Sequence, residues 1–183
     1  MKSLDILKED HALVERVLDL MERAGCHMRE GQPLPADFER WAIDFLWHFA
    51  EHCHHAKEVG SLFPLLQIRG ISSDGGPLGV LLAEHKRGLA YLERIQDAHS
   101  RQDRIGFALL SGEYSQLLRQ QIARENQVLL QMVETCLSEE DDAELVERFH
   151  SVDREQRGQE LRRRYHAEIA QWEEAFREPV GPC

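Results

Sequence analysis

Titratable side chains interrupt the apolar stripes of four long helical segments, and they do so at matching positions. In residues 36–67 the series on one helix face is Trp47, Glu51, His54, Glu58, Leu62 and Leu65. Residues 103–137 repeat the same spacing with Tyr114, Leu118, Gln121, Glu125, Leu129 and Met132. Steps of three and four residues place each series on a single face of a helix. Burying an unpartnered carboxylate is strongly unfavourable, so the pattern excludes a purely apolar helical core.

The other two segments share a second pattern, with one histidine in an otherwise apolar stripe. Residues 4–30 give Leu4, Leu7, His11, Val14 and Leu18, and residues 77–100 give Leu78, Leu81, His85, Gly88 and Leu92. An α-helix rises about 1.5 Å per residue, which brings the polar positions of all four segments to a common height in an up-down-up-down bundle. We therefore predict one internal polar layer, formed by His11, His54, Glu58, His85 and Glu125.

Proline and glycine mark the joints between these segments. GQPLP (31–35) and RGISSDGGPLG (69–79) are the clearest breaks, and Ser138 with Asp141 resembles a capping box that starts a further helix. Runs that alternate with period two are few and β-branched residues are scarce, so the class is all-α. We predict a single domain over 1–183, with an antiparallel up-down-up-down four-helix bundle at about 4–137 and a C-terminal helical extension at about 139–178, loosened by Gly158.

The charge balance limits the partners. The chain has 33 acidic and 22 basic residues, a net charge of −11, which argues against nucleic acid or an anionic membrane as a partner. The basic cluster LRRRYH (161–166) lies among glutamates and is interpreted as a solvated face. No apolar run reaches the length of a membrane span, and no C-x-x-C pair or disulfide-scaffold density is present. A reduced cytoplasm is the predicted location.

A buried layer of two carboxylates and three imidazoles needs a compensating positive charge, and a bound cation supplies it. Imidazole nitrogen with carboxylate oxygen suits iron, manganese or zinc, and two carboxylates able to bridge favour a dinuclear iron or manganese centre. His55 is an alternative to His54 as ligand, and Glu51 is placed to accept the proton of either imidazole. Lys57 is given no part in metal binding, and Cys53 falls outside the stripe.

Three stretches, CHHAKEVGSLFPLL, GGPLGVLLAEHKRG and LLRQQIARENQVLL, resemble the hemerythrin-like, HHE cation-binding domains of bacteria. The resemblance runs from EDHALVERVL to the C-terminal tail. It implies an antiparallel four-helix bundle that holds a non-haem di-iron centre. The ligands it implies are His11 and His85 from the first and third helices, His54 with Glu58 from the second, and Glu125 from the fourth.

Two positions depart from the family pattern. Gln121 stands where the fourth helix would have the histidine of its H-x-x-x-E motif, so one of the two metals is expected to be weakly held, exchange-prone or absent. Leu89 stands where oxygen-carrying hemerythrins have a second histidine on the third helix, which argues against reversible oxygen carriage.

The expected function is that of a di-iron protein that binds or senses a small diatomic ligand or peroxide (dioxygen, nitric oxide or hydrogen peroxide) or buffers iron. Two alternatives stay open at this point. One is a di-iron enzyme, a peroxidase, an oxidase or a protein of iron–sulfur repair. The other is a structural bundle with a single adventitious metal.

Overall fold

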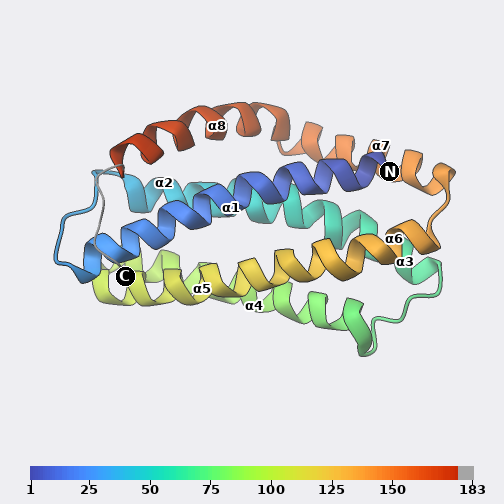
Figure 1. Ribbon diagram of the computed structural model, residues 1–183, viewed down its shortest axis with the longest axis horizontal. Coiled ribbons are helices and arrows are strands. Elements are labelled where there is room, and N and C mark those ends of the chain that lie inside the picture. The colour runs from blue at the N-terminus through green and yellow to red at the C-terminus, as the bar shows by residue number, and fades with distance from the viewer. Residues whose placement is uncertain (177–183) are drawn as a thin grey trace.

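The computed structural model describes residues 1–176, and within them the chain is helical with no strand. Four helical rods form the bundle, and two further helices lie on its side (Figure 1). The first and third rods are regular α-helices, α1 (Lys2–Arg29) and α4 (Gly76–Ser100). The bounds of all four rods agree closely with those expected from the sequence.

The second and fourth rods change their winding at mid-length. The second runs through α2 (Phe38–Phe45), the π-helical segments η1 (Leu46–His55) and η2 (Glu58–Leu62), and α3 (Phe63–Ile68). The fourth runs through α5 (Arg104–Arg124), η3 (Glu125–Leu129) and α6 (Leu130–Cys136). A π-helix bonds each N–H to the carbonyl five residues back and is frequent at functional sites. Two of these π-helical segments begin with a predicted carboxylate, η2 with Glu58 and η3 with Glu125.

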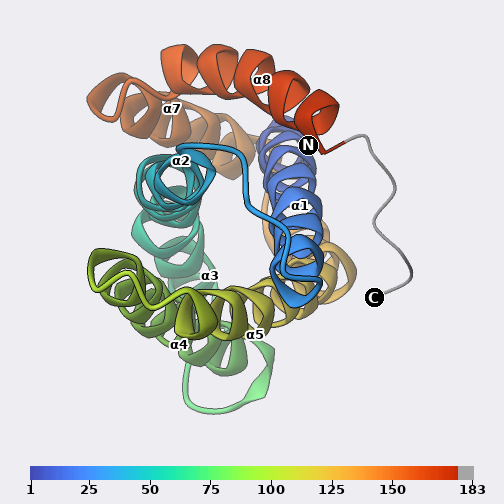
Figure 2. The same ribbon diagram turned by 90° about the vertical axis from the view of Figure 1, so that its left-hand side faces the viewer.

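The rods pack as an antiparallel bundle, as predicted. Seen end-on, α1 and the α2–α3 rod stand opposite each other, with α4 and α5 along a third side (Figure 2). Contacts join α1 to α5 and η1, and α4 to α2, η1 and α5. The four-helix bundle fold is therefore confirmed.

Two apolar clusters fill the bundle, one toward each end. The first includes Val14, Leu18, Phe45, Leu92 and Leu118. The second, toward the N-terminus of α1, includes Leu4, Leu7, Leu62, Leu81 and Leu129. The predicted polar residues fall between these two sets along each rod, so the polar layer is enclosed by apolar packing on both sides.

The remaining helices, α7 (Glu139–Glu155) and α8 (Gly158–Ala175), form an arm that lies along α1 and the α2–α3 rod (Figures 1 and 2). The predicted capping box is confirmed: the Ser138 hydroxyl accepts from the Asp141 N–H, and the Asp141 carboxylate accepts from the Ser138 N–H. The predicted end of this extension, at about 178, lies outside the described residues.

The basic cluster in α8 is not the solvated face that the sequence suggested. Tyr165 is completely buried and its hydroxyl donates to the Asp44 carboxylate, 2.8 Å away. Arg162 is only 21% exposed and its guanidinium faces the bundle. The polar groups on one side of α8 therefore form hydrogen bonds and ion pairs with residues of the bundle. Arg163 and His166 are exposed.

Gly158 makes room for a neighbouring carboxylate, a role that the sequence did not suggest. A Cβ at this position would lie 2.4 Å from Oδ1 of Asp153 and 3.2 Å from its Cα. Asp153 is short and is held by an ion pair to Lys57, so it has little freedom to move aside. Gly112, inside α5, has no such neighbour within 4 Å.

The two glycines should therefore respond oppositely to alanine. Gly112→Ala should raise the free energy of unfolding by about 0.5–1 kcal/mol, because alanine is the better helix former. Gly158→Ala should lower it by about 1–3 kcal/mol through overpacking against Asp153. Urea unfolding followed by circular dichroism measures both, and equal stabilisation by the two substitutions would refute the tight contact.

Candidate metal centre

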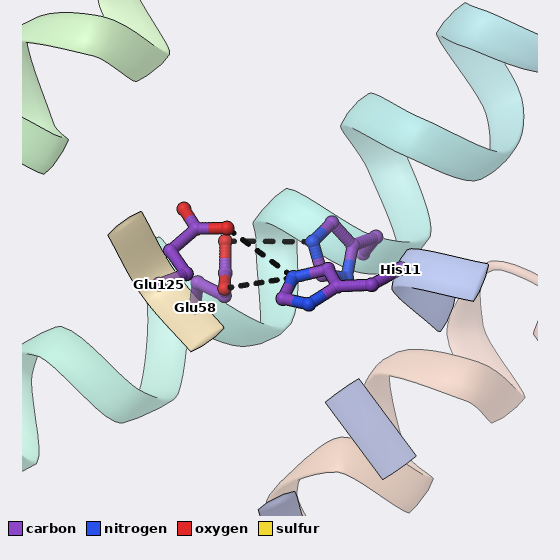
Figure 3. Close-up of side chains that lie close together, drawn as sticks. His11, Glu58 and Glu125 are labelled. Carbon is purple, nitrogen blue, oxygen red and sulfur yellow. Dashed lines mark ion pairs between the residues drawn. The ribbon is translucent and has the colours of Figure 1, made fainter. Parts of the chain in front are cut away.

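Four rods bring histidine and glutamate side chains to one buried cluster in the middle of the bundle. His11 comes from α1, Glu58 from the start of η2 and Glu125 from the start of η3, and Figure 3 shows the imidazole facing both carboxylates. The potential ligand atoms form two groups, and within each group all of them lie within 4.8 Å of one another. The first group is His11, His54, Glu58 and Glu125, and the second is His55, Glu58 and His85. Glu58 belongs to both groups, so the cluster consists of two joined halves.

The first half pairs His11 and His54 with the two carboxylates. Nε2 of His11 lies 3.2 Å from Oε2 of Glu125 and 3.9 Å from Oε1 of Glu58. Nε2 of His54 lies 3.6 Å from Oε2 of Glu58. These four side chains are at most 2% exposed.

In the second half His85 faces the same two carboxylates, and His55 joins His85 and Glu58 in one ligand group. Nε2 of His85 lies 2.9 Å from Oε2 of Glu58 and 3.9 Å from Oε1 of Glu125. The His55 and His85 rings are 4.4 Å apart between centroids. Glu58 and Glu125 thus each face histidines of both halves, which is the position of a bridging ligand.

The π-helical winding of η1 explains why consecutive histidines enter the same cluster. In a regular α-helix His54 and His55 would point well apart, and the sequence therefore treats them as alternatives. A π-helix uses more residues per turn, so the angle between successive side chains is smaller. His54 and His55 both turn inward and supply one imidazole to each half.

The same winding shifts the stripe upstream. Trp47 and Glu51 are only half-buried, while Cys53, which the sequence places outside the stripe, is completely buried. The expectation for Cys53 was therefore wrong, because it assumed a regular helix period through this segment. Tyr114 lies in the core, as predicted.

Oxygen atoms face the outer nitrogen of every histidine in the cluster. The Nδ1 atoms lie near Asn126 Oδ1 for His11 at 3.0 Å, Glu51 Oε2 for His55 at 3.0 Å, the Leu81 carbonyl for His85 at 2.8 Å, and Asp10 Oδ2 for His54 at 3.7 Å. An acceptor at Nδ1 keeps the proton there and leaves Nε2 with its lone pair directed at the cluster. Glu51 takes this role for His55, as the sequence suggested.

Several polar atoms at the centre have no hydrogen-bond partner although they are fully buried. Among the described residues these include Nε2 of His11, Nε2 of His54, Oε1 of Glu58 and Oε2 of Glu125. Unsatisfied buried polar groups are rare in folded proteins and call for an unseen partner. A cation would satisfy all four atoms, so the donor set fits a metal ion.

The charges in the cluster shift the pKa values of its members strongly. Burial alone would lower the pKa of His11 and His85, but the carboxylates of Glu58 and Glu125 outweigh it and raise both to about 9. Burial would raise the pKa of Glu58, but the surrounding imidazoles lower it to about 2. The pKa of His55 is lowered by its burial and by the neighbouring His85. Protons on His11 and His85 thus balance the negative charge of the carboxylates, as a bound metal ion would do in their place.

Gln121 lies inside the second half. Its Nε2 is 3.2 Å from Nε2 of His55 and 3.3 Å from Nε2 of His85, and it donates to Oε1 of Glu125 at 3.1 Å. Its side chain is completely buried. The amide therefore occupies the place that faces the two imidazoles of this half.

All five residues predicted from the sequence, His11, His54, Glu58, His85 and Glu125, lie in this cluster. The sequence reasoning did not foresee His55 as a simultaneous member, nor Asp10 behind His54. It also gave Lys57 no role, whereas the structure buries Lys57 completely and pairs it with Asp10 at 2.7 Å. The one sequence feature that could have indicated a role for Asp10 is its position directly before His11.

The fold and the cluster together define a four-helix-bundle protein with a metal-binding core. The protein-family model of the hemerythrin HHE cation binding domain matches residues 2–133 of the sequence. This match covers most of the chain, and the protein belongs to that family. No curated protein and no solved structure matches the chain.

The matched region ends before α7, so the arm lies outside it. Among the described helices, none is both long and apolar enough to cross a membrane.

The raised pKa values predict opposite pH trends for the metal-free and metal-loaded protein. His11 and His85 have pKa values of about 9 when folded and 6.5 as free side chains. Without metal, their contribution to stability is complete below pH 6.5 and is lost as the pH rises through 9. With metal, these protons must leave, so the stabilisation by metal should grow over the same range. Thermal unfolding at pH 6.5 and 9, with chelator and with metal, measures both trends, and parallel trends would contradict the assignment.

Proposed function

We propose that this protein holds a dinuclear non-haem iron centre and binds a small diatomic ligand or peroxide there. His11 and His54 would hold one iron, His55 and His85 the other, and Glu58 and Glu125 would bridge them. The observation that carries this proposal is the pair of two-imidazole halves that share carboxylates. A site for a single metal has no need of a second pair of imidazoles around the same glutamates.

The donor set favours iron over the other candidate metals. Imidazole and carboxylate suit iron, manganese and zinc alike, but structural zinc sites in proteins are usually closed, tetrahedral and rich in cysteine. Cys53 is buried outside the two ligand groups, and no cysteine among residues 1–176 belongs to either group. Bridging carboxylates in the core of a helical bundle are typical of dinuclear iron and manganese. We infer iron as the resident metal, with manganese or zinc as substitutes.

Ligand binding requires a coordination position that the protein leaves open. Each half offers two imidazoles and access to two carboxylates, which is fewer donors than the six that octahedral coordination takes. Iron in such a site supplies the capacity to bind and reduce dioxygen, peroxide or nitric oxide. The residues of this chain supply the orientation of the donors and the exclusion of water, because the centre lies between two apolar clusters.

Gln121 makes the second half the expected place for the small ligand. An amide is a weaker donor to iron than imidazole, so a ligand displaces it at lower cost. Its Nε2 and Oε1 exchange places when the amide turns over, which allows it either to donate to a bound ligand or to offer oxygen to the metal. Oε1 has no hydrogen-bond partner among the described residues.

A surface groove gives this half an approach from solvent. The groove is lined by residues that include Trp47, Glu51, His55, Val59 and Leu89. His55 lines this groove, whereas His11, His54, Glu58 and Glu125 do not. A small molecule that reaches the groove is therefore separated from the second half by few side chains.

Anaerobic titration with ferrous iron tests the proposal. The protein should bind about two irons per chain, the second less tightly. Glu125→Ala should lose iron, because it removes a bridging carboxylate, while Glu134→Ala on the exposed side of α6 should not. A stoichiometry of one, or equal iron content in the two variants, would overturn the dinuclear assignment.

Addition of small ligands to the iron-loaded protein separates the functional options. A changed visible spectrum with nitric oxide or dioxygen supports ligand binding. Rapid consumption of peroxide supports the enzymatic alternative, and iron uptake without either response supports iron buffering.

Replacing Gln121 by histidine should tighten the second iron and slow the binding of small ligands. Imidazole is the stronger donor, so Gln121→His should raise the affinity for the second iron by about tenfold or more. Gln120→His is the matched control, because its side chain is exposed on the same helix. Ferrous titrations and stopped-flow mixing with nitric oxide measure both effects. Identical curves for the wild type and Gln121→His would remove Gln121 from the ligand-binding half.

A further inference from the structure

A network of four charged side chains lies directly behind the first half of the cluster. Lys57 is completely buried, and its Nζ lies 2.7 Å from Oδ2 of Asp10 and 2.9 Å from Oδ1 of Asp153. Arg162 donates to Oδ1 of Asp10 from Nε at 3.1 Å and from Nη2 at 2.6 Å. Its Nη1 lies 3.5 Å from Oδ2 of Asp153.

The network joins the arm to the bundle. On the bundle side, Asp10 belongs to α1 and Lys57 lies between η1 and η2. On the arm side, Asp153 lies in the last turn of α7 and Arg162 belongs to α8. Two positive and two negative charges balance one another. Removing one partner of a buried ion pair leaves an uncompensated charge and is costly, so this arrangement has one well-defined geometry.

Asp10 connects this network to the metal centre. Its Oδ2 lies 3.7 Å from Nδ1 of His54, which has no hydrogen-bond partner among the described residues. An imidazole that binds a cation through Nε2 carries its proton on Nδ1 and needs an acceptor there. The Asp10 carboxylate, held from its other side by Lys57 and Arg162, is in position to be that acceptor.

We infer that Asp10 and Arg162 are positioning residues for the metal bound by His11 and His54, and that α8 thereby couples its own docking to the occupancy of this half. The inference rests on the proposed function, because it requires metal in the cluster. Arg162 holds the carboxylate at His54 and does not itself approach the ligands. If the docked arm favours metal at this half, metal favours the docked arm by the same factor.

The coupling is confined to one half. His55 and His85 have their Nδ1 acceptors on Glu51 and Leu81, neither of which touches the network. The arm also has attachments that do not lead to a histidine of the cluster. Arg164 pairs with Asp44, and the Trp172 ring packs against Phe38. Loss of arm docking and loss of the Asp10 contact are therefore separable by substitution.

Titration of three variants with ferrous iron, and with cobalt(II) as a spectroscopic probe, tests the inference. Arg162→Gln should lower the binding affinity for one of the two metals by about 10- to 100-fold, which is the range for residues that hydrogen-bond to metal ligands. The affinity for the other metal should be unchanged. Arg162→Lys should restore part of the loss because it keeps a positive charge beside Asp10. Arg164→Gln, on the same helix but paired with Asp44 instead of Asp10, should bind both metals like the wild type.

Hydrogen exchange of the wild-type protein provides a test that needs no variant. Metal loading should slow the exchange of amides in α8, and Arg162→Gln should abolish this slowing. Unchanged exchange in α8 of the wild type, or equal effects of Arg162→Gln and Arg164→Gln on both metals, would overturn the inference. A wild type that binds two irons with such results would leave the proposed function standing, whereas a wild type that takes up no metal would overturn both.

Discussion

The carboxylates of Glu58 and Glu125, buried among four imidazoles, are the constraint on which the rest of the structure depends. Neither side chain is exposed, and within residues 1–176 their ion pairs are all with histidines rather than with arginine or lysine. The charge is balanced by protons on His11 and His85, whose pKa values rise to about 9, or by a cation. The apolar clusters on both sides keep water out, which strengthens every electrostatic interaction between them.

The arm on the bundle follows the same electrostatic logic at a second level. Asp10 adds a further negative charge next to the histidines. Burial raises the pKa of this carboxyl, but the contact with His54 and the charges of Lys57 and Arg162 outweigh burial and hold the pKa far below its usual range. The family match stops at residue 133, so Arg162 and Asp153 lie outside the matched region. The arm is joined to the bundle through these charges, and the join lies next to His54 of the cluster.

The fold and most of the cluster could be predicted from the sequence because they follow from a regular helical period. His11, His85 and Glu125 lie on stripes that the structure preserves, and the capping residues set the start of α7 correctly. The period fails in η1, so neither the joint presence of His54 and His55 nor the burial of Cys53 could be read from spacing. Lys57 and Arg162 escaped detection for another reason. Charged residues are rarely buried, and only tertiary contacts between segments far apart in the chain show that these two have partners.

The π-helical winding also makes the length of the second rod part of its function. Beyond Glu58, the residues that fill the end of the bundle, such as Leu62 and Leu66, are brought to the core by the turns that precede them. Removing one residue between Leu46 and Leu62 would favour a return to α-helical pairing, in which His54 and His55 would point well apart. Substitutions here alter single contacts, but an insertion or deletion would alter the winding that turns both histidines into the cluster. Apart from His54, His55 and Glu58, this segment should therefore tolerate substitutions far more readily than a change in residue count.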